Sequence, residues 1–248
     1  MAADLKIDES VYVPSSRVNG LESVGVALYK TKVVEIAKRK VKVQLRDGNV
    51  SDWIGAALVH RGVGILVVNI GDFQSEHTLL DPLAKSVGQF CRLLVPDDQI
   101  RALRVRSLSE LTCFWRREQA AYSHVIWIGH GSPNGIYFAV DGLVSSDRLN
   151  AALHFRGAED KIFVSLCCQT GYQSFGAAVS RSTICRTFLG PFHSVEGAIA
   201  SQFCQTFLAV HFLQGMTVAA AFRAAREAVP GSASFRLWKN GQLTAAPR

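Results

Sequence analysis

Three continuous apolar runs constrain the fold of this chain more than any other feature. They read "GILVVNI" at 64–70, "HVIWIG" at 124–129 and "KIFVSLC" at 161–167. None of them alternates strictly between apolar and polar residues, so each is typical of a strand that is covered on both faces. Segments with helical spacing lie between the runs. This order of strands and helices predicts an α/β fold with a mostly parallel sheet flanked by helices.

Further segments extend this alternation between strands and helices. Ser107 and Glu110 have the spacing of a capping box, which predicts that a helix begins there. Pro82 stands near the start of "HTLLDPLAKSVGQFCRLL", where a helix tolerates proline. We also expect short strands at "IRALRVRS", "GIYFAV" and "STICRTFLG", a helix at "SSDRLNAAL", and two helices within "HSVEGAIASQFCQTFLAVHFLQGMTVAAAFRAAREAV".

The first 61 residues follow a different pattern. Short segments there alternate apolar and polar residues and end in glycine or Asp-Gly turns, as in "KVKVQLRDGN", which predicts antiparallel strands. We therefore expect a β-rich region at 1–61, either barrel-like or a hairpin extension of the main sheet, and a second domain at 62–248. The β-rich region has no cysteine and one histidine, His60. We expect it to serve recognition or regulation rather than chemistry.

The net charge of +7 raises the question of a nucleic-acid partner. Much of this charge lies at 30–46, where basic residues interleave with valine and lack a row of aromatic residues on which bases could stack. Such a face either meets a protein partner or keeps a strand edge in solution. We expect protein partners and no nucleic acid. The basic residues are Lys30, Lys32, Lys38, Arg39, Lys40, Lys42 and Arg46.

Composition and spacing argue against several other classes of protein. No apolar run reaches the roughly 18 residues that span a bilayer, and the polar, acidic start "MAADLKIDES" is not a secretory signal. We therefore expect a cytoplasmic protein without membrane contact. The six cysteines do not suggest a disulfide framework in such a chain. Because the sequence has no CxxC pair and no HExxH motif, we expect no metal ion or other cofactor.

Two of the apolar runs end in residues that can carry chemistry. His130 stands between two glycines directly after the second run, and the third run ends in Cys167, which Cys168 follows. In open α/β sheets the chemistry lies beyond the carboxyl ends of the strands. If the two parent strands are neighbours, an imidazole and a thiol meet at one edge. A thiol attacks as the thiolate, and an imidazole can take its proton.

Each of these signals is weak alone, because a histidine after a strand is usually a loop residue and an apolar cysteine is usually core. Their joint occurrence at two strand ends favours a site. Strand alternation points the two cysteines to opposite faces, so only one can meet His130. The glycines beside His130 allow a substrate backbone to approach and leave the Gly131 amide free to stabilise an oxyanion. Asp72 ends the first run at the same edge, where it orients His130, contacts substrate or simply forms a turn.

Three segments carry a resemblance to a known family. "HVIWIGHG", "GIYFAVDGLVSSDRLNAAL" and "KIFVSLCCQTG" resemble the CHAT branch of the caspase-like cysteine proteases, which is related to caspases and separase. The similarity extends over about residues 62–230 and includes the C-terminal strand and helix pair. It implies a caspase-like fold and a cysteine endopeptidase that cleaves a specific protein and is regulated by a protein partner, in bacterial signalling or antiviral defence. The first 60 residues match nothing in the family.

The resemblance also implies roles for single residues. His130 becomes the general base and acid, and Cys168 becomes the nucleophile, because "CCQTG" then aligns without a gap on the family's Cys-x-Ser/Thr-Gly. Cys167 is then a core residue. The backbone amides of Gly131 and Cys168 become the oxyanion donors.

The sequence departs from the family pattern at two places. Metacaspases carry an acidic residue two positions before the nucleophile, whereas this chain has Leu166, so a preference for lysine or arginine is not supported. The CHAT tail usually has a tryptophan where this chain has Phe192 or His193. His193 is therefore a candidate pocket residue together with Asp72, although it could instead cap the helix that follows.

We therefore expect a cysteine endopeptidase with a His–Cys dyad. The alternative is a non-catalytic caspase-like module that binds a protein partner through its β-rich N-terminus. The presence of both motif residues favours the enzyme.

Overall fold

The computed structural model describes residues 5–19, 21, 25–72, 74–154 and 161–245. Its larger part is built on a seven-stranded sheet with the order β14-β13-β12-β11-β7-β5-β6. The strands from β6 to β12 are parallel to one another, whereas β13 and β14 run antiparallel. The expected α/β class with a mostly parallel sheet is confirmed. The strands are β5 (Ile65–Ile70), β6 (Ile100–Val105), β7 (His124–Ile128), β11 (Lys161–Ser165), β12 (Cys185–Pro191), β13 (Phe235–Lys239) and β14 (Gln242–Ala245).

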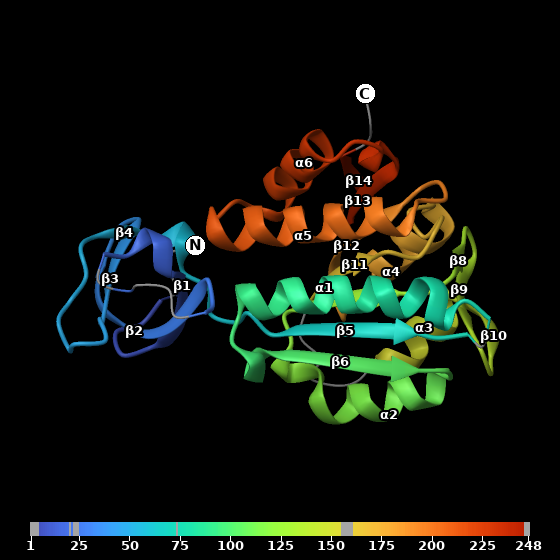
Figure 1. Ribbon diagram of the computed structural model, residues 1–248, viewed down its shortest axis with the longest axis horizontal. Helices are drawn as coiled ribbons and strands as arrows, with labels where there is room; N and C mark the ends of the chain where they lie inside the picture. Colours follow the sequence, from blue (N-terminus) through green and yellow to red (C-terminus); the bar gives the residue numbers. More distant parts are fainter. Residues whose placement is uncertain (1–4, 20, 22–24, 73, 155–160, 246–248) are drawn as a thin grey trace.

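Helices cover both faces of this sheet (Figure 1). Residues of α1, α5 and α6 share one hydrophobic cluster with Val67 and Ile126, and residues of α2, α3 and α4 share a second cluster with Val68 and Trp127. Because neighbouring strand residues point to opposite faces, both faces need apolar side chains, which accounts for the continuous runs. The helices are α1 (Asp81–Leu94), α2 (Leu108–Glu118), α3 (Ser146–Leu153), α4 (Ala178–Ser180), α5 (Gly197–Leu213) and α6 (Val218–Ala228).

The helix starts follow the local signals in the sequence. Ser107 caps α2, its side chain accepting from the Glu110 amide while the Glu110 carboxylate accepts from the Ser107 amide, so the predicted capping box is confirmed. Ser145 caps α3 through the amide of Arg148. The hairpin of β13 and β14 was not among the predicted strands, although Asn240 and Gly241 form its turn with positive φ, as Asn-Gly pairs commonly do.

The N-terminal residues form a four-stranded antiparallel sheet of their own. Among the described residues, none of its strands pairs with the seven-stranded sheet, so it is not a hairpin extension. It encloses a separate small cluster that includes Val13, Val33 and Val43. The strands are β1 (Ser10–Pro14), β2 (Leu28–Ala37), β3 (Lys40–Val43) and β4 (Ile54–Gly55). We call residues 5–61 the N-terminal β unit.

The N-terminal β unit lies beyond the amino ends of the parallel strands (Figure 1). His60 Nε2 lies 2.9 Å from the carbonyl oxygen of Phe212 on α5, and the Ala27 amide donates to the carbonyl oxygen of Leu93 at the end of α1 at 2.9 Å. Tyr12 and Leu28 are buried in the hydrophobic cluster of α1 and α5. The unit is therefore packed firmly against the end of the sheet opposite to the carboxyl ends.

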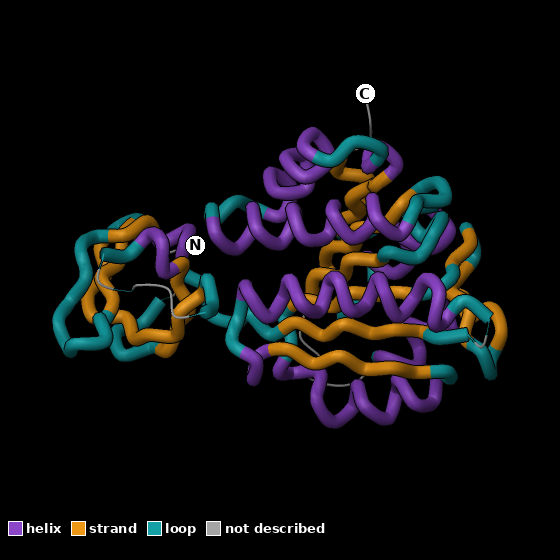
Figure 2. The backbone as a smooth tube through the Cα atoms, viewed as in Figure 1, coloured by secondary structure: helices purple, strands orange, loops and turns teal. Residues whose placement is uncertain are grey.

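A small three-stranded sheet lies at the carboxyl end (Figure 2). Its strands are β8 (Gly131–Ser132), β9 (Gly135–Phe138) and β10 (Gly142–Ser145). It begins immediately after His130, so the predicted strand at "GIYFAV" belongs to this sheet and not to the large one. The Asp141–Gly142 turn joins β9 to β10, with Gly142 at φ 67°. This small sheet stands beside the edge at which His130 and the cysteines meet.

Candidate active site

His130 lies two residues beyond the end of β7, in the loop that leads into β8. Its carbonyl oxygen accepts a hydrogen bond from the Tyr137 amide at 2.9 Å, which fixes the backbone against β9. Its ring atom Nε2 lies 3.0 Å from Asp72 Oδ2 and 2.5 Å from Ser75 Oγ. The side chain is 40% exposed. One nitrogen of the imidazole is therefore held by the protein while the ring stays open to solvent.

Asp72 follows β5 and forms a turn that ends at Ser75. Its Oδ1 accepts from the amides of Gln74 at 2.9 Å and Ser75 at 2.6 Å, and the Ser75 hydroxyl lies 3.1 Å from both carboxylate oxygens. Partial burial alone would raise the pKa of Asp72, but the hydrogen bonds from Ser75 and Gln74 and the charge of His130 outweigh it, so the pKa is lowered. Asp72 therefore stays ionised and faces the imidazole. The structure brings it to His130, in the orienting position.

Ser75 was missed in the sequence. Nothing in its spacing marks it, because its contact with His130 depends on how the turn after β5 folds. The signal that could have found it is the order Asp-x-x-Ser directly after a buried strand, which favours a turn closed by the aspartate side chain.

The two cysteines have different surroundings. β11 ends at Ser165, so both lie beyond the strand, and not within it as expected. Cys167 is fully buried in the cluster of α2 and α3, and this burial raises the pKa of its thiol to about 12. Cys168 is half-buried, and its Sγ lies 3.8 Å from the Val195 carbonyl oxygen. Of the two, only Cys168 is partly accessible to solvent.

Buried hydrogen bonds fix the loop that carries the cysteines. The Thr170 hydroxyl is fully buried and lies 2.8 Å from both Ser165 Oγ and the Cys167 carbonyl oxygen. The Gly171 amide donates to Pro191 at the end of β12 at 2.7 Å. Gln169 adopts φ 60°, a conformation in which L residues other than glycine are uncommon. The tight turn directly after Cys168 is thus held in place beside a thiol that is half-buried.

The histidine and cysteine motifs pack directly against each other. β7 and β11 are neighbours in the sheet, and a Cβ atom built on Gly131 would lie only 2.4 Å from the Cys168 carbonyl oxygen. It would also lie 3.0 Å from the Cys167 Cβ. Glycine is therefore required at 131 because the two loops pack closely, which differs from the expectation that it makes room for substrate.

The backbone amide of Gly131 is free for another role. In the ladder of β8 and β9, Gly131 is opposite Ile136, and the bond from the Tyr137 amide to the His130 carbonyl flanks this pair. In an antiparallel ladder this arrangement marks a pair without mutual hydrogen bonds, so the Gly131 amide points away from β9. The geometry is compatible with a donor to a bound oxyanion.

The segment after β12 forms the other wall beside Cys168. His193 is exposed, and its carbonyl oxygen accepts from the Gln169 amide at 3.4 Å. Glu196, not His193, is the N-cap of α5, so the capping role considered for His193 is wrong. Phe192 stacks on Tyr172 with ring centroids 4.0 Å apart, and the Arg236 guanidinium lies 3.4 Å from the Phe192 centroid. The sequence did not predict this stack, because Arg236 lies on β13, which was not among the predicted strands.

Neither a metal site nor a membrane span is found in the part of the chain that the structure describes. No three side chains of histidine, cysteine, aspartate or glutamate there are grouped so that they could hold a metal ion. No helix there is both long and apolar enough to cross a bilayer.

The chain shows no match to a known family profile and no significant similarity to a curated protein sequence.

Proposed function

We propose that this protein is a caspase-like cysteine endopeptidase with Cys168 as its nucleophile and His130 as its general base and acid. The observation that carries the proposal is the packing of Gly131 on Cys168 while Asp72 and Ser75 hold Nε2 of His130. This arrangement leaves Nδ1 as the nitrogen that can serve the thiol. A nucleophile, a base and a group that orients the base are the three parts that thiol catalysis needs.

The reaction proceeds in two stages. Nδ1 of His130 takes the proton of the Cys168 thiol, and the thiolate attacks the carbonyl carbon of the scissile peptide. The amides of Gly131 and Cys168 donate to the oxyanion that forms. The imidazolium then gives its proton to the leaving amine, and a thioester remains on Cys168. A water molecule, deprotonated by His130, hydrolyses this thioester and restores the free thiol.

Asp72 contributes by position and charge. An ionised carboxylate against Nε2 favours the tautomer with its proton on that nitrogen, so that Nδ1 is the free base. It also stabilises the imidazolium that forms in each proton transfer. Asp72 is therefore an orienting group in this proposal and not a substrate contact.

A serine nucleophile is a poorer explanation of the same cluster. Ser75 lies 2.5 Å from His130, but it contacts Nε2, the nitrogen that Asp72 also contacts. In a serine triad the nucleophile and the acid occupy opposite nitrogens of the imidazole. Ser75 therefore acts as a second group that holds the ring.

The order of the elements supports membership of the CHAT branch. A histidine after one parallel strand and a cysteine after its neighbour, followed by two helices, is the arrangement that the resemblance implies. The same resemblance implies that the substrate is a specific protein. It also implies regulation by a protein partner, in bacterial signalling or antiviral defence. His193 remains a candidate pocket residue, because it is exposed beside the loop of Cys168.

The experiment that tests this proposal looks for proteolytic cleavage in a mixture of all the proteins of a cell. The purified protein is incubated with proteins from its own cells, and new N-termini are identified by mass spectrometry. We expect new termini with the wild type and with Cys113→Ala, a control at another exposed cysteine. We expect none with Cys168→Ala or His130→Ala. Identical termini in all four samples would contradict the proposal, and a wild type that binds a partner without cutting it would support the non-catalytic alternative.

A further inference from the structure

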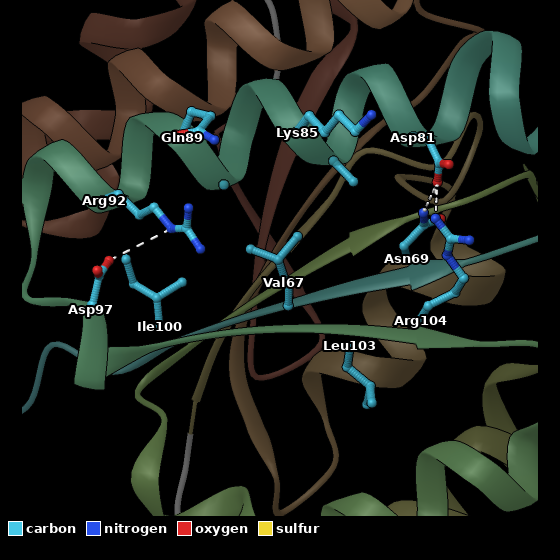
Figure 3. Close-up of a pocket in the computed structure, with 13 residues that line it drawn as sticks. Val67, Asn69, Asp81, Lys85, Gln89, Arg92, Asp97, Ile100, Leu103 and Arg104 are labelled. Atoms are coloured by element: carbon cyan, nitrogen blue, oxygen red, sulfur yellow. Dashed lines mark hydrogen bonds and ion pairs between the residues drawn. The ribbon is translucent and has the colours of Figure 1, made fainter.

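A cavity of about 500 Å³ lies between α1 and β6, away from His130 and Cys168 (Figure 3). β6 is the edge strand of the large sheet, and its residues Ile100, Ala102 and Arg104 share the face that borders the cavity. Ala102 and Arg104 are exposed there. A volume of this size is typical of sites for small organic ligands.

The middle of the cavity is apolar and roomy. Val67 and Ile100 face it from the sheet (Figure 3), and Ala84 and Gly88 line it from α1. A Cβ atom built on Gly88 would meet no atom within 4 Å. Glycine weakens a helix relative to alanine, and nothing in the packing requires it at this position. The small residues of α1 therefore leave space for a flat apolar group.

One rim of the cavity is basic. Lys85 and Arg92 project from α1, and Lys85 forms no ion pair with any residue that the structure describes. Arg92 lies 3.6 Å from Asp97, and both side chains are largely exposed. Exposed pairs of this kind are weak, so Arg92 is also available to an anionic group. Gln89 stands between them on the same helix.

The end of the cavity toward which Lys85 points holds a buried acceptor without a donor (Figure 3). Asn69 is 6% exposed and lines the cavity on the same face of β5 as Val67. Its Nδ2 donates to Asp81 Oδ1 at 3.0 Å, but its Oδ1 accepts no hydrogen bond from a described residue. A buried acceptor that lacks a partner is costly. A donor on a bound molecule would satisfy it.

We propose that this cavity binds a small organic anion that has a flat apolar body and an N–H donor. The anionic group lies at Lys85, the apolar body lies on Val67 and Ile100, and the N–H group donates to Asn69. This inference does not depend on the proposed protease activity, because none of these residues belongs to the candidate active site.

Contacts connect this cavity with the turn that holds His130. Arg104 lies 2.6 Å from Asp81 Oδ1 and 2.7 Å from Glu76 Oε1. Glu76 is buried and packs on Gly71, where an added Cβ would lie 3.1 Å from Glu76 Oε2. Asp72 is the next residue. Asn69 donates to Asp81, so a ligand on Asn69 is one hydrogen bond away from the ion-pair network that supports the turn of Asp72.

The test uses two fluorescent probes that differ in one group. Anilinonaphthalene sulfonate has an aromatic body, an N–H group and a sulfonate, and N-phenylnaphthylamine has the same rings and N–H group without the sulfonate. Fluorescence titration should give at least about tenfold tighter binding of the sulfonate. Lys85→Gln should remove most of this preference, and its exposed position makes a folding defect unexpected. Equal affinity of the two probes for the wild type would overturn the proposal.

A second variant tests the place of binding. Gly88→Phe fills the cavity and should weaken sulfonate binding at least about tenfold. Ala151→Phe adds the same ring at an exposed position of α3 and should bind like the wild type, and circular dichroism checks the fold of each variant. Loss of binding in both phenylalanine variants, or an unchanged affinity in Gly88→Phe, would show that the probe binds elsewhere.

Discussion

The two nitrogens of His130 have different surroundings, and this difference decides what the side chain can do. Nε2 contacts Asp72 and Ser75, whereas Nδ1 has no hydrogen bond with a described residue. Because strand ends converge in a parallel sheet, the sequence was enough to predict that the loop of His130 lies beside the loop of the two cysteines. The choice of Cys168 over Cys167 came from the family resemblance. The sequence could not predict Ser75 or the packing role of Gly131. Those depend on which atoms of distant loops meet, and spacing along the chain does not specify that.

The first prediction concerns the reactivity of the six cysteines. Iodoacetamide at neutral pH should alkylate Cys168 faster than Cys167, whose thiol is fully buried and has a pKa of about 12. Peptide mass spectrometry over a time course measures the rates. Exposed Cys113 is the internal control for access alone, and it should react more slowly because it does not share the proposed site with His130. Alkylation of Cys167 ahead of Cys168 would reverse the assignment.

The second prediction separates catalysis from stability at His130. His130→Ala should lower the cleavage rate by at least about 10²-fold, because both proton transfers are lost. Its side chain is 40% exposed, so the free energy of unfolding should change by no more than about 1 kcal/mol. Urea unfolding and cleavage assays on the same samples give both quantities. A variant that cuts at nearly the wild-type rate would contradict the role of the imidazole.

The third prediction tests the orienting group. Asp72→Asn should reduce the rate at least about tenfold, because a neutral amide neither fixes the tautomer nor stabilises the imidazolium. Ser75→Ala should cost less, since the backbone amides of Ser75 and Gln74 still hold the carboxylate. The comparison uses kcat and KM, and we expect the loss in kcat. A loss confined to KM would instead make Asp72 a substrate contact.

At the scale of elements, helices and strands could be predicted where the sequence pattern that marks them lies within the element itself. The capping box of α2 and the continuous runs of β5, β7 and β11 are local, and each of these elements formed within its predicted segment, although β11 ends at Ser165, before the end of its run. The strands β13 and β14 lie after Pro230 and Gly231. The Asn-Gly pair of their turn is a hairpin signal in the sequence, but these strands were not among the predicted ones. The separation of the N-terminal strands from the large sheet could not be predicted. Pairing partners of antiparallel strands are set by packing, which alternation alone does not specify.

A cluster of three histidines joins the N-terminal β unit to the α/β part. The ring of His211 on α5 lies 5.4 Å from that of His124 on β7 and 6.0 Å from that of His60. Burial lowers the pKa of His60 to about 4 and that of His124 well below its usual value, and it also lowers the pKa of His211. The neighbouring charged residue Arg61 is paired with Glu9 at 2.6 Å. The folded state therefore keeps these imidazoles neutral.

The fourth prediction follows from the sign of these shifts. A histidine has a pKa of about 6.5 in the unfolded chain, so below that pH the unfolded state binds more protons than the folded state. The free energy of unfolding should therefore be highest above about pH 6.5. It should fall as the pH drops towards about 4, by up to about 1.4 kcal/mol per pH unit for each histidine. Thermal unfolding across this range measures the slope. His211→Gln should flatten it, while His77→Gln, at a site that is 89% exposed, should not.

At the scale of the whole molecule, the N-terminal β unit and the candidate active site lie at opposite ends of the sheet (Figure 1). The unit contacts the α/β part through Tyr12, which is buried in the cluster of α1 and α5, and through His60, whose Nε2 lies 2.9 Å from the Phe212 carbonyl oxygen. His130 and Cys168 follow the carboxyl ends of the strands. The unit therefore does not contribute to the candidate active site. A role in recognition or regulation would have to act on a part of the partner that lies away from the bond to be cut.

The fifth prediction tests that role through the basic face of the unit. Lys38 and Lys40 are exposed at the turn between β2 and β3 and form no ion pair among the described residues. Replacing both by glutamate should weaken partner binding and leave alkylation of Cys168 unchanged. Lys42 is less suitable, because it pairs with Glu35 at 3.1 Å and lies over the Trp53 ring. If binding and cleavage of the true substrate persist in the double variant, the lysines only keep the edge in solution.

The position of the N-terminal β unit has a consequence for any protein that it captures. The parallel strands between the two ends are about six residues long, as in β5, which corresponds to about 20 Å at the usual rise per residue. A substrate anchored on the unit must therefore carry its cleavage point at least that far from its anchoring patch, along a segment that is free to unwind. The length of the strands would thus set the minimum distance between the anchoring patch and the cleavage point. Shortening the spacer of such a substrate should stop its cleavage while its capture continues.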